Sequence, residues 1–526
     1  MTTQPDFLMT DNHVPWAWGV GNDVWGIFKA AMTGDIVGLG QLLDKEPSLI
    51  RCSCHYREPM HFAVREGQLE AVRFLLDRGA EVPYATGKGT HDSAVMMAFD
   101  RGDTEVHSLL SEHLFEAFGI CEAGDTVGAA IRDLSSAESS KLIIQHGVDV
   151  ADARGNKALH WAVMTRQRTL IDLCLKHGAD INATRPDGAR PLDLTNGDYY
   201  YRGWRDTHPE GESDHWVLVE HLLASGADYD LTMAARRNDI DRVREILAED
   251  PEAANRDALY NTWYSGFPLR SAAKAGHIEI VRLLLEHGAD PNKPEHDLAP
   301  FGGSLYDSAQ NGHYDVVKLL LENGGNPNQD VESSGCPLSA ATDDRTRQLL
   351  REYGAIYDAF GCCYWCQPVD FATLCQRDAF VTNDSSMFAL AVERCPEIVE
   401  IFLKYQPDLW ERMPAKLGKT PEVTKQMVRS GMNPNRTNWL GIHPLHRGCR
   451  EEQLAMWLQL GADINMVCSE HQSTPLGYAA RRGDVAFAKL LLRNGADPTL
   501  AGHEWAKPVE WARRRSNPAM VELLGG

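Results

Sequence analysis

Short runs of apolar residues at helical spacing recur along the chain, and a glycine follows most of them. The clearest example is the stretch Arg57–Val82. Pro59 is suited to the first turn of a helix, where its missing N–H needs no partner, and Gly79 stands where a left-handed residue would end a second helix. Between them, Gly67 separates two apolar runs. The pattern predicts two short helices and a reversal, a unit that must pack against a neighbour to bury its apolar faces.

The glycine that follows an apolar run, called the closing glycine below, marks the end of a repeat and allows the repeats to be counted. It recurs after an apolar pair or triplet at Gly79, Gly147, Gly178, Gly226, Gly288, Gly324, Gly354, Gly431, Gly461 and Gly495. Several of these intervals are about 30–36 residues long, and the longer ones are close to multiples of that length or contain insertions. Such a period indicates an array of stacked helical repeats, in which each unit packs only against its neighbours.

Two sets of motifs carry a resemblance to a known family. The segments EPMHFA (58–63), KALHWA (157–162), HPLHRG (443–448) and STPLGYA (473–479) are similar to the ankyrin T-P-L-H-x-A signature, and HGADIN (177–182), HGADPN (287–292) and NGADPT (494–499) match its hairpin. The chain resembles the ankyrin repeat family over nearly its whole length. This implies an all-α solenoid of roughly 13–15 units, several of them degenerate, with long insertions. It also implies that His61, His160 and His446 tie each hairpin to a first helix by hydrogen bonds.

Departures from the repeat divide the chain into four predicted segments. Residues 1–23 are rich in tryptophan, which predicts a cap over the first repeat or, alternatively, a peptide-binding arm. Residues 24–356 form a first ankyrin stack. Residues 357–385 are predicted to be an irregular, cysteine-rich insertion, and residues 386–526 a second stack that ends in a solvent-facing cap.

The net charge of the chain limits the classes of partner, and its cysteine spacing bears on its location. The chain has 74 Asp and Glu against 52 Lys and Arg, a net charge of −22, which disfavours nucleic acid and an anionic membrane surface. No stretch approaches 18 apolar residues, and the start of the chain resembles neither a signal peptide nor an anchor. The cysteines lack the spacing of a small disulfide-rich domain, so we expect a reducing, cytoplasmic location.

The sequence predicts no cofactor and no metal site. No phosphate-binding loop, dinucleotide fingerprint, zinc-protease motif or nucleophile elbow is present. Cys363 and Cys366, flanked by Cys362 and Cys375, have the spacing of one zinc-binding arm, but no second arm follows. We therefore expect partly buried structural thiols there.

The candidate functional residues are unusual side chains on the loops between repeats. Ankyrin arrays present these loops and the first helices on one concave surface. Aromatic side chains supply much of the binding energy at protein interfaces, which favours loops that carry them. The predicted binding residues are His55, Tyr56, Lys88, His91, Asp92, Arg154, Tyr260, Trp263, Tyr264, Phe301, Trp439 and His443.

Two functions remain open. The ankyrin resemblance implies a scaffold that binds another protein, and the negative charge would speed association with a basic segment. The alternative is a small-molecule-binding protein or enzyme, in which His91, Asp92, Tyr264 or His443 would do acid–base work in a closed groove. The insertion Tyr199–Trp204 could shield the repeats or narrow the groove.

Overall fold

Pairs of short helices follow one another through most of the computed structural model of this chain. The structure describes residues 2–525 with the exception of 56, 83–93, 199–200, 204, 207, 257–266, 296–301, 332–334 and 419. Its residues group into two compact units. One comprises Ala31–Met97 and Thr104–Ile356, and the other comprises Met1–Ala30, Ala98–Asp103 and Tyr357–Gly526.

The unit that contains residues 104–356 is built from helices alone in its described part. The α-helices are α2 (Ile36–Lys45), α3 (Pro59–Arg65), α4 (Leu69–Asp77), α6 (Thr104–Phe118), α7 (Glu122–Asp133), α8 (Ser136–His146), α9 (Ala158–Met164), α10 (Arg168–Lys176), α11 (His215–Ala224), α12 (Leu231–Arg236), α13 (Ile240–Glu249), α14 (Pro268–Ala275), α15 (Ile278–Glu286), α16 (Ser304–Gln310), α17 (Tyr314–Glu322), α18 (Pro337–Ala340) and α19 (Asp344–Glu352). The 3₁₀ helices are η3 (Pro47–Arg51), η4 (Pro191–Leu194) and η5 (Pro251–Asn255).

The unit that contains residues 357–526 adds one small hairpin, β1 (His13–Val14) paired antiparallel with β2 (Gly19–Val20). Its α-helices are α20 (Ala359–Trp365), α21 (Pro368–Arg377), α22 (Ser385–Arg394), α23 (Pro396–Tyr405), α24 (Leu409–Arg412), α25 (Pro421–Arg429), α26 (Pro444–Arg447), α27 (Glu451–Gln459), α28 (Pro475–Arg482), α29 (Val485–Arg493), α30 (Pro508–Arg514) and α31 (Pro518–Leu523). Its 3₁₀ helices are η1 (Asp6–Leu8), η2 (Pro15–Ala17), η7 (Ala379–Asn383) and η8 (Glu504–Ala506). Helices α1 (Gly21–Thr33) and α5 (Ala94–Arg101) have residues in both units.

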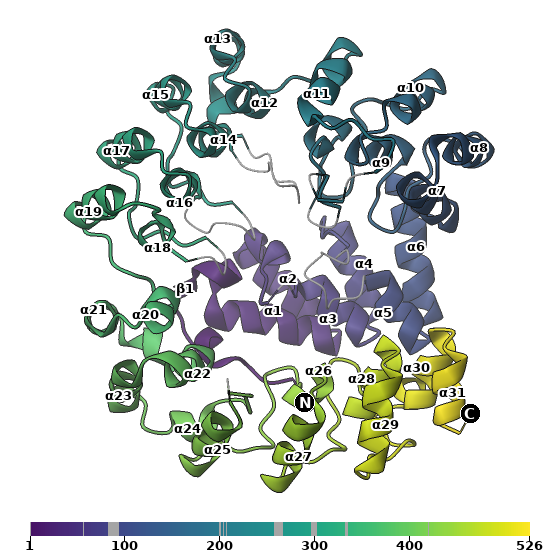
Figure 1. Cartoon of the computed structure of the whole chain (residues 1–526), viewed down its shortest axis with the longest axis vertical. Coiled ribbons are helices and arrows are strands. Elements are labelled where there is room, and N and C mark those ends of the chain that lie inside the picture. The colour runs from purple at the N-terminus through teal and green to yellow at the C-terminus, as the bar shows by residue number, and fades with distance from the viewer. Residues whose placement is uncertain are drawn as a thin grey trace. The chain divides into compact units, whose positions relative to one another are not determined.

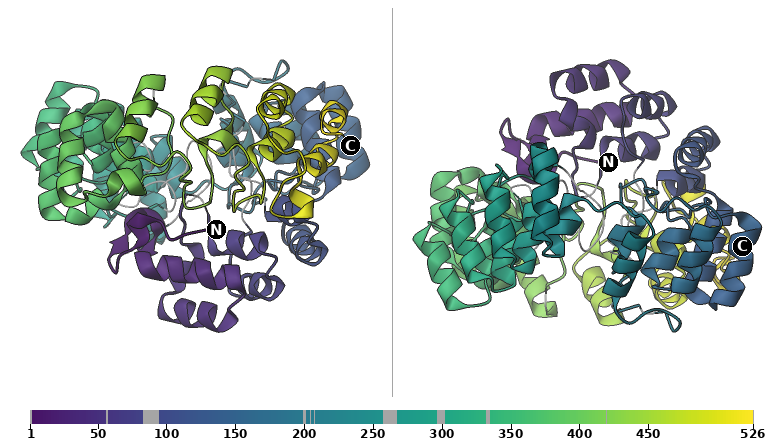
Figure 2. Two further views of the ribbon diagram at one scale, coloured as in Figure 1. Left: turned by 90° about the horizontal axis from the view of Figure 1, so that it is seen from below. Right: turned by 90° about the horizontal axis from the view of Figure 1, so that it is seen from above.

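The pair α14–α15 shows how the sequence specifies the repeat. Pro268 begins α14, and Gly276 ends it in the left-handed region at φ 77°, which a residue with a Cβ adopts only with strain. Leu269 on α14 and Leu284 on α15 are fully buried. Helix α14 packs between α12 and α16, so the first helices form one row and the second helices form another, as Figures 1 and 2 show for α12–α19. The predicted all-α solenoid is confirmed.

A ladder of asparagines joins consecutive hairpins. The side-chain N–H of Asn292 donates to the carbonyl of Gly324 at 2.8 Å, and its oxygen accepts the backbone N–H of Asn326 at 2.7 Å. The same pair of bonds is made by Asn255, Asn328 and Asn435, and Asn182 and Asn465 make the second of them. Each Asn thus satisfies backbone groups of the next repeat, which sets the spacing of neighbouring hairpins.

We expect Asn292→Ala to lower the free energy of unfolding by about 1–3 kcal/mol, because it removes both hydrogen bonds to the next repeat. Urea denaturation followed by circular dichroism measures the change. Asn494→Ala is the matched control, since that side chain donates within its own repeat, to the carbonyl of Leu490. If the two variants lose the same free energy of unfolding, the bonds between repeats stabilise the protein no more than a bond within one repeat.

Residues 357–385, predicted to be irregular, are helical. Helices α20 and α21 form a pair that packs on α22 and α23, with η7 after it. The apolar face that drives this packing consists of Cys362, Cys363, Phe371 and Cys375, all buried. Pro368 begins α21, where a proline is favourable. The cysteines therefore act as small apolar core residues, and this segment is one more repeat.

No helix in the described part of the chain is both long enough and apolar enough to cross a lipid bilayer.

Candidate binding surface

The loops between the second helix of one pair and the first helix of the next, such as residues 147–157, 177–190 and 430–443, are called fingers below. Within each unit, the fingers and the first helices together are called the finger surface. Two signature histidines fix its geometry. His160 accepts the N–H of Lys157 at 3.1 Å and lies 3.0 Å from the carbonyl of Ala183 in the next finger. His446 makes the equivalent contacts, 3.1 Å to the N–H of His443 and 3.1 Å to the carbonyl of Met466.

These contacts confirm the predicted structural role of His160 and His446. Burial lowers the pKa of His160 to about 3 and that of His446 to about 4. Both imidazoles are therefore neutral at pH 7. His61 occupies the same place in α3 and is buried, with an edge contact to the ring of Phe62 at 5.3 Å.

Most of the predicted binding residues lie outside the described residues: Tyr56, Lys88, His91, Asp92, Tyr260, Trp263, Tyr264 and Phe301. Four can be placed. His55, Arg154, Trp439 and His443 all lie on fingers, in loops before α3, α9 and α26.

His443 is the exception among these four, because it is buried. It caps α26 by accepting the N–H of Leu445 at 3.2 Å, its other ring nitrogen lies 2.8 Å from the carbonyl of Pro434, and the ring packs edge-on to Trp457. Burial lowers its pKa to about 4. These contacts correct the prediction for His443, which serves the finger's own structure and has no free nitrogen for a partner or for acid–base work.

The other three residues are accessible. His55 is exposed at the tip of a tight turn closed by Cys54 and Arg57, with a left-handed φ of 50°. Arg154 is half-buried in a turn whose backbone is held by Asp152, and Trp439 is half-buried in the finger before α26.

Beneath Arg154 lies a buried polar network that the sequence patterns did not reveal. Asp152 accepts the N–H groups of Arg154 and Asn156, both at 2.9 Å, and the indole N–H of Trp161 at 2.7 Å. Arg185 from the next finger donates to Asn156 at 2.9 Å. It also pairs with Asp187 and Asp198 at 2.6 and 2.8 Å. The network locks two successive fingers together and fixes the direction of the turn that carries Arg154.

The insertion between η4 and α11 folds against the repeats. Tyr201 is buried, with its ring edge-on to Trp161 at 5.7 Å. Arg166, in the turn after α9, donates to the carbonyl of Ser213 at 3.0 Å and to the side chain of Asn196 at 2.6 Å. Glu210 accepts the N–H of Ser136 at 2.9 Å. The insertion therefore shields the inter-helix turns of two repeats, whereas Tyr199, Tyr200 and Trp204 lie outside the described residues.

The beginning of the chain contacts η7, α24 and the finger before α26. The backbone N–H of Thr3 donates to the carbonyl of Trp439 at 3.0 Å. The side-chain amide of Asn383 donates to the carbonyl of Asp6 at 3.0 Å, and the Asp6 carboxylate lies 3.4 Å from Arg412. Burial raises the pKa of Asp6, although Arg412 acts in the opposite direction. The first residues of the chain are thus held there by backbone and side-chain contacts.

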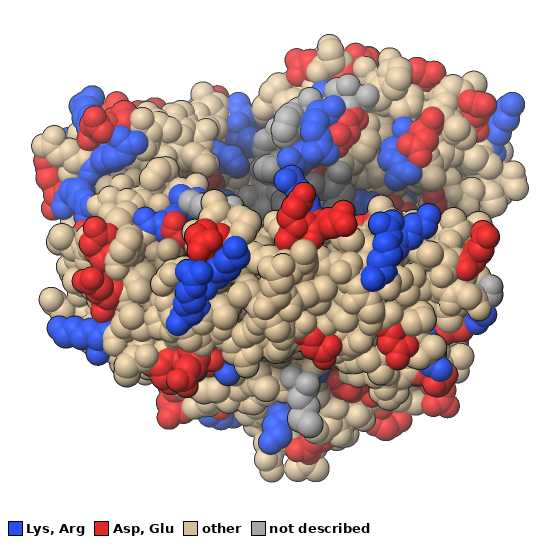
Figure 3. All heavy atoms as spheres, turned by 60° about the horizontal axis from the view of Figure 1, so that its bottom comes forward, with Lys and Arg blue, Asp and Glu red and all other residues tan. Residues whose placement is uncertain are grey.

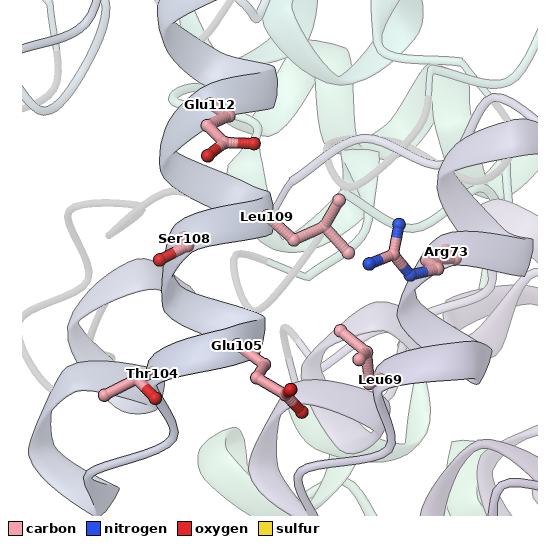
Figure 4. A pocket seen from close by; sticks show the side chains of 7 residues that line it. All are labelled: Leu69, Arg73, Thr104, Glu105, Ser108, Leu109 and Glu112. Atoms are coloured by element: carbon pink, nitrogen blue, oxygen red, sulfur yellow. The ribbon is translucent and has the colours of Figure 1, made fainter.

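Two hollows on the described residues lie away from the fingers. A hollow of about 370 Å³ separates the second helices α4 and α6, where Leu69 and Arg73 face Leu109 and Glu105 in Figure 4. Another, of about 500 Å³, lies beside α30 and α31 and includes Asn517. Neither brings His, Asp and Tyr side chains together.

The negative charge of the chain is dispersed over the face drawn in Figure 3. Acidic and basic side chains alternate there, and wide uncharged areas lie between them. Many of the charged residues are paired at the surface, for example Arg244 with Asp241 at 3.1 Å. Such exposed pairs contribute little to the stability of the fold.

Models of the ankyrin repeat match residues 56–88 and 154–183, a model of three ankyrin repeats matches 213–295 and 231–331, and a model of many ankyrin repeats matches 442–492.

Similar proteins include the chicken "Nuclear factor NF-kappa-B p105 subunit", 35% identical over 262 residues, which cover 46% of this chain and 26% of that protein. They also include the mouse "2-5A-dependent ribonuclease", 39% identical over 66 residues (12% and 8%), and the rice "Probable E3 ubiquitin-protein ligase XBOS31", 35% identical over 85 residues (16% and 19%). The chain spans about a quarter or less of the length of each relative. The repeat models and the helix pairs agree, and the chain is an ankyrin repeat protein.

Proposed function

We propose that this protein is an interaction scaffold whose finger surface binds an extended segment of another protein. The observation that carries the proposal is the set of contacts that Thr3 and Asp6 make with Asn383 in η7, Arg412 in α24 and Trp439 in the finger before α26. A partner segment that displaces the first residues of the chain would meet the same donors and acceptors.

The chemistry of these contacts suggests what kind of segment would bind there. The carbonyl of Trp439 and the amide of Asn383 engage backbone groups, which any sequence can supply. Arg412 engages a carboxylate, so one position of the bound segment would favour Asp or Glu. The net charge of −22 acts at longer range and would speed the approach of a partner that is basic overall.

The alternative of a catalytic or small-molecule pocket has no comparable support among the described residues. The two hollows described above are lined by second or terminal helices, and His443 caps α26. A cytoplasmic location stays a prediction.

Capture from cell lysate with the tagged full-length chain tests the proposal. We expect His55→Ala, Arg154→Ala and Trp439→Ala together to reduce captured protein about tenfold or more, because accessible aromatic and arginine side chains supply much of an interface's energy. The matched control is Lys176→Ala with Lys489→Ala, exposed positions on the second helices α10 and α29. Loss of capture in the control, with the finger variant unaffected, would contradict the proposal.

A further inference from the structure

Two cysteines and a glutamate meet where two helix pairs of residues 357–405 join. Cys366 ends α20 in the left-handed region at φ 52°, and Cys395 is the N-cap of α23. The two are linked as a disulfide, with their Cα atoms 5.0 Å apart. Glu397, in the first turn of α23, places Oε2 3.6 Å from the sulfur of Cys366 and 3.4 Å from that of Cys395. The three ligand atoms lie within 4.8 Å of one another.

Glu397 is exposed in the first turn of α23, a position that favours an acidic side chain, and its carboxylate lies beside the two sulfurs. A disulfide sulfur has no proton, so it gives a carboxylate nothing to accept. Within the described part of the chain, the Glu397 carboxylate has no partner other than these two sulfurs. Reduction would separate the bonded sulfurs into two thiols beside this carboxylate, and two thiolates with a carboxylate repel one another unless a cation lies between them.

The neighbouring cysteines do not share this environment. Cys363 and Cys375 are buried in the core with Phe371, and burial raises their pKa values to about 12 and about 11. Cys363 and Cys366 therefore do not form the two-cysteine zinc-binding arm that their spacing resembles. The sulfur of Cys363 points into the core, whereas that of Cys366 points toward α23. The second thiol of the cluster, Cys395, comes 29 residues after Cys366, which is why the spacing did not reveal it.

We propose that, once the disulfide is reduced, Cys366, Cys395 and Glu397 bind Zn²⁺. A thiol reductant opens the bridge: the reductant's two thiols become its own disulfide, and the two cysteine sulfurs receive the electrons and two protons. Zn²⁺ then displaces those two protons and binds both thiolates and the carboxylate.

The ligand set and its position suit that metal. Thiolates select soft or borderline ions such as Zn²⁺ over Mg²⁺ or Ca²⁺, and a carboxylate is an accepted third ligand. The N-terminus of a helix favours the ionised form of a thiol, and Cys395 caps the ten-residue helix α23. Three protein ligands leave the fourth tetrahedral position open to water or to another ligand. The ion would tie the end of α20 to the start of α23, across two neighbouring repeats.

Cobalt(II) is the probe for the test, because it takes the place of Zn²⁺ and gives a near-ultraviolet charge-transfer band with thiolate ligands. The full-length protein is first reduced with excess dithiothreitol, which is removed under nitrogen, and a thiol count confirms that the bridge is open. We expect one equivalent of Co²⁺ to develop the band and Zn²⁺ to abolish it.

The variants assign the band to the three residues. Cys366→Ser and Cys395→Ser should each weaken Co²⁺ binding at least tenfold and reduce the band, whereas Glu397→Gln should keep the band and weaken binding. Cys121→Ser, a partly exposed cysteine in another repeat, is the matched control and should match the wild type. Thermal unfolding in the absence of metal verifies that each variant is folded. The absence of a band in the reduced wild type, or an unchanged band in folded Cys366→Ser, would overturn the proposal.

Discussion

Replacing Arg270 by methionine is expected to lower the free energy of unfolding by about 3–5 kcal/mol. Arg270 lies in α14 and is largely buried between two carboxylates from later repeats. It pairs with Glu295 and, at 2.6 Å, with Asp307 in α16. Glu295 is fully buried and also accepts the N–H of Phe267 at 2.9 Å. Burial raises the pKa of Glu295, and Arg270 opposes that shift, so removing the guanidinium leaves two acidic groups buried without their cation.

Urea denaturation of the full-length protein at pH 7.5 measures this loss. Arg282→Met is the matched control, because Arg282 is exposed on α15 and its pair with Glu279 is at 4.0 Å. Exposed pairs of this kind contribute about 0–1 kcal/mol. A loss below about 1 kcal/mol in Arg270→Met would contradict a structural role for the three charges.

Lowering the pH from 7.5 to 5.0 is expected to cost about 6 kcal/mol of stability through three buried histidines. Burial depresses the pKa of His160 to about 3 and the pKa values of His443 and His446 to about 4. In the unfolded chain each imidazole takes up a proton below its ordinary pKa of about 6.5, whereas the folded chain does not. The stabilisation is therefore complete above pH 6.5 and is lost as the pH falls toward the folded pKa. Each histidine contributes about 2 kcal/mol of the change.

Urea denaturation at several pH values tests the direction and the size of the effect. His160→Asn should reduce the difference between pH 7.5 and 5.0 by about 2 kcal/mol, because it removes one of the three groups. The same replacement at His177, which is exposed, is the control and should leave the difference unchanged. If His160→Asn retains the full pH dependence, its imidazole is not the source of the stability.

The features that the sequence predicted are local ones. A closing glycine, a proline at the start of a helix and a histidine three residues after its N-cap each act within a few residues. They could therefore be identified from spacing alone, as for Gly79, Pro59 and His160. The hairpin motif ends in an asparagine, so the residue that bonds to the next repeat, such as Asn292, could also be located from the sequence.

The features that the sequence did not predict depend on which repeats are neighbours. Arg270 finds its partners 25 and 37 residues later, and Cys366 finds its partner 29 residues later. Such pairs become visible only when the repeats are stacked. The helix pair α20–α21 was missed for another reason. Its two helices are neither separated nor followed by a glycine, the signal used to count the repeats, and its cysteines were expected to be partly buried thiols but not the apolar face of a helix pair.

Two of the predicted binding residues that the structure describes are histidines on fingers, and they differ in burial. His443 and His55 are both finger histidines, but the first caps α26 while the second is exposed. The sequence around His443 contains a proline and the signature histidine His446, which mark the start of a helix. A residue in the N-cap position turns inward to bond the first N–H groups, so position relative to the helix start would have identified it.

Site-specific photo-crosslinking tests the central claim most directly. A benzophenone amino acid is placed at Trp439 or Arg154 on the fingers and, in a separate variant, at Lys489 on α29, and the full-length protein is irradiated in lysate. If the finger surface binds the partner, crosslinked protein forms from positions 439 and 154 and not from 489. Crosslinks to a partner from position 489, with none from 439 or 154, would place the interaction on the second helices and contradict the account.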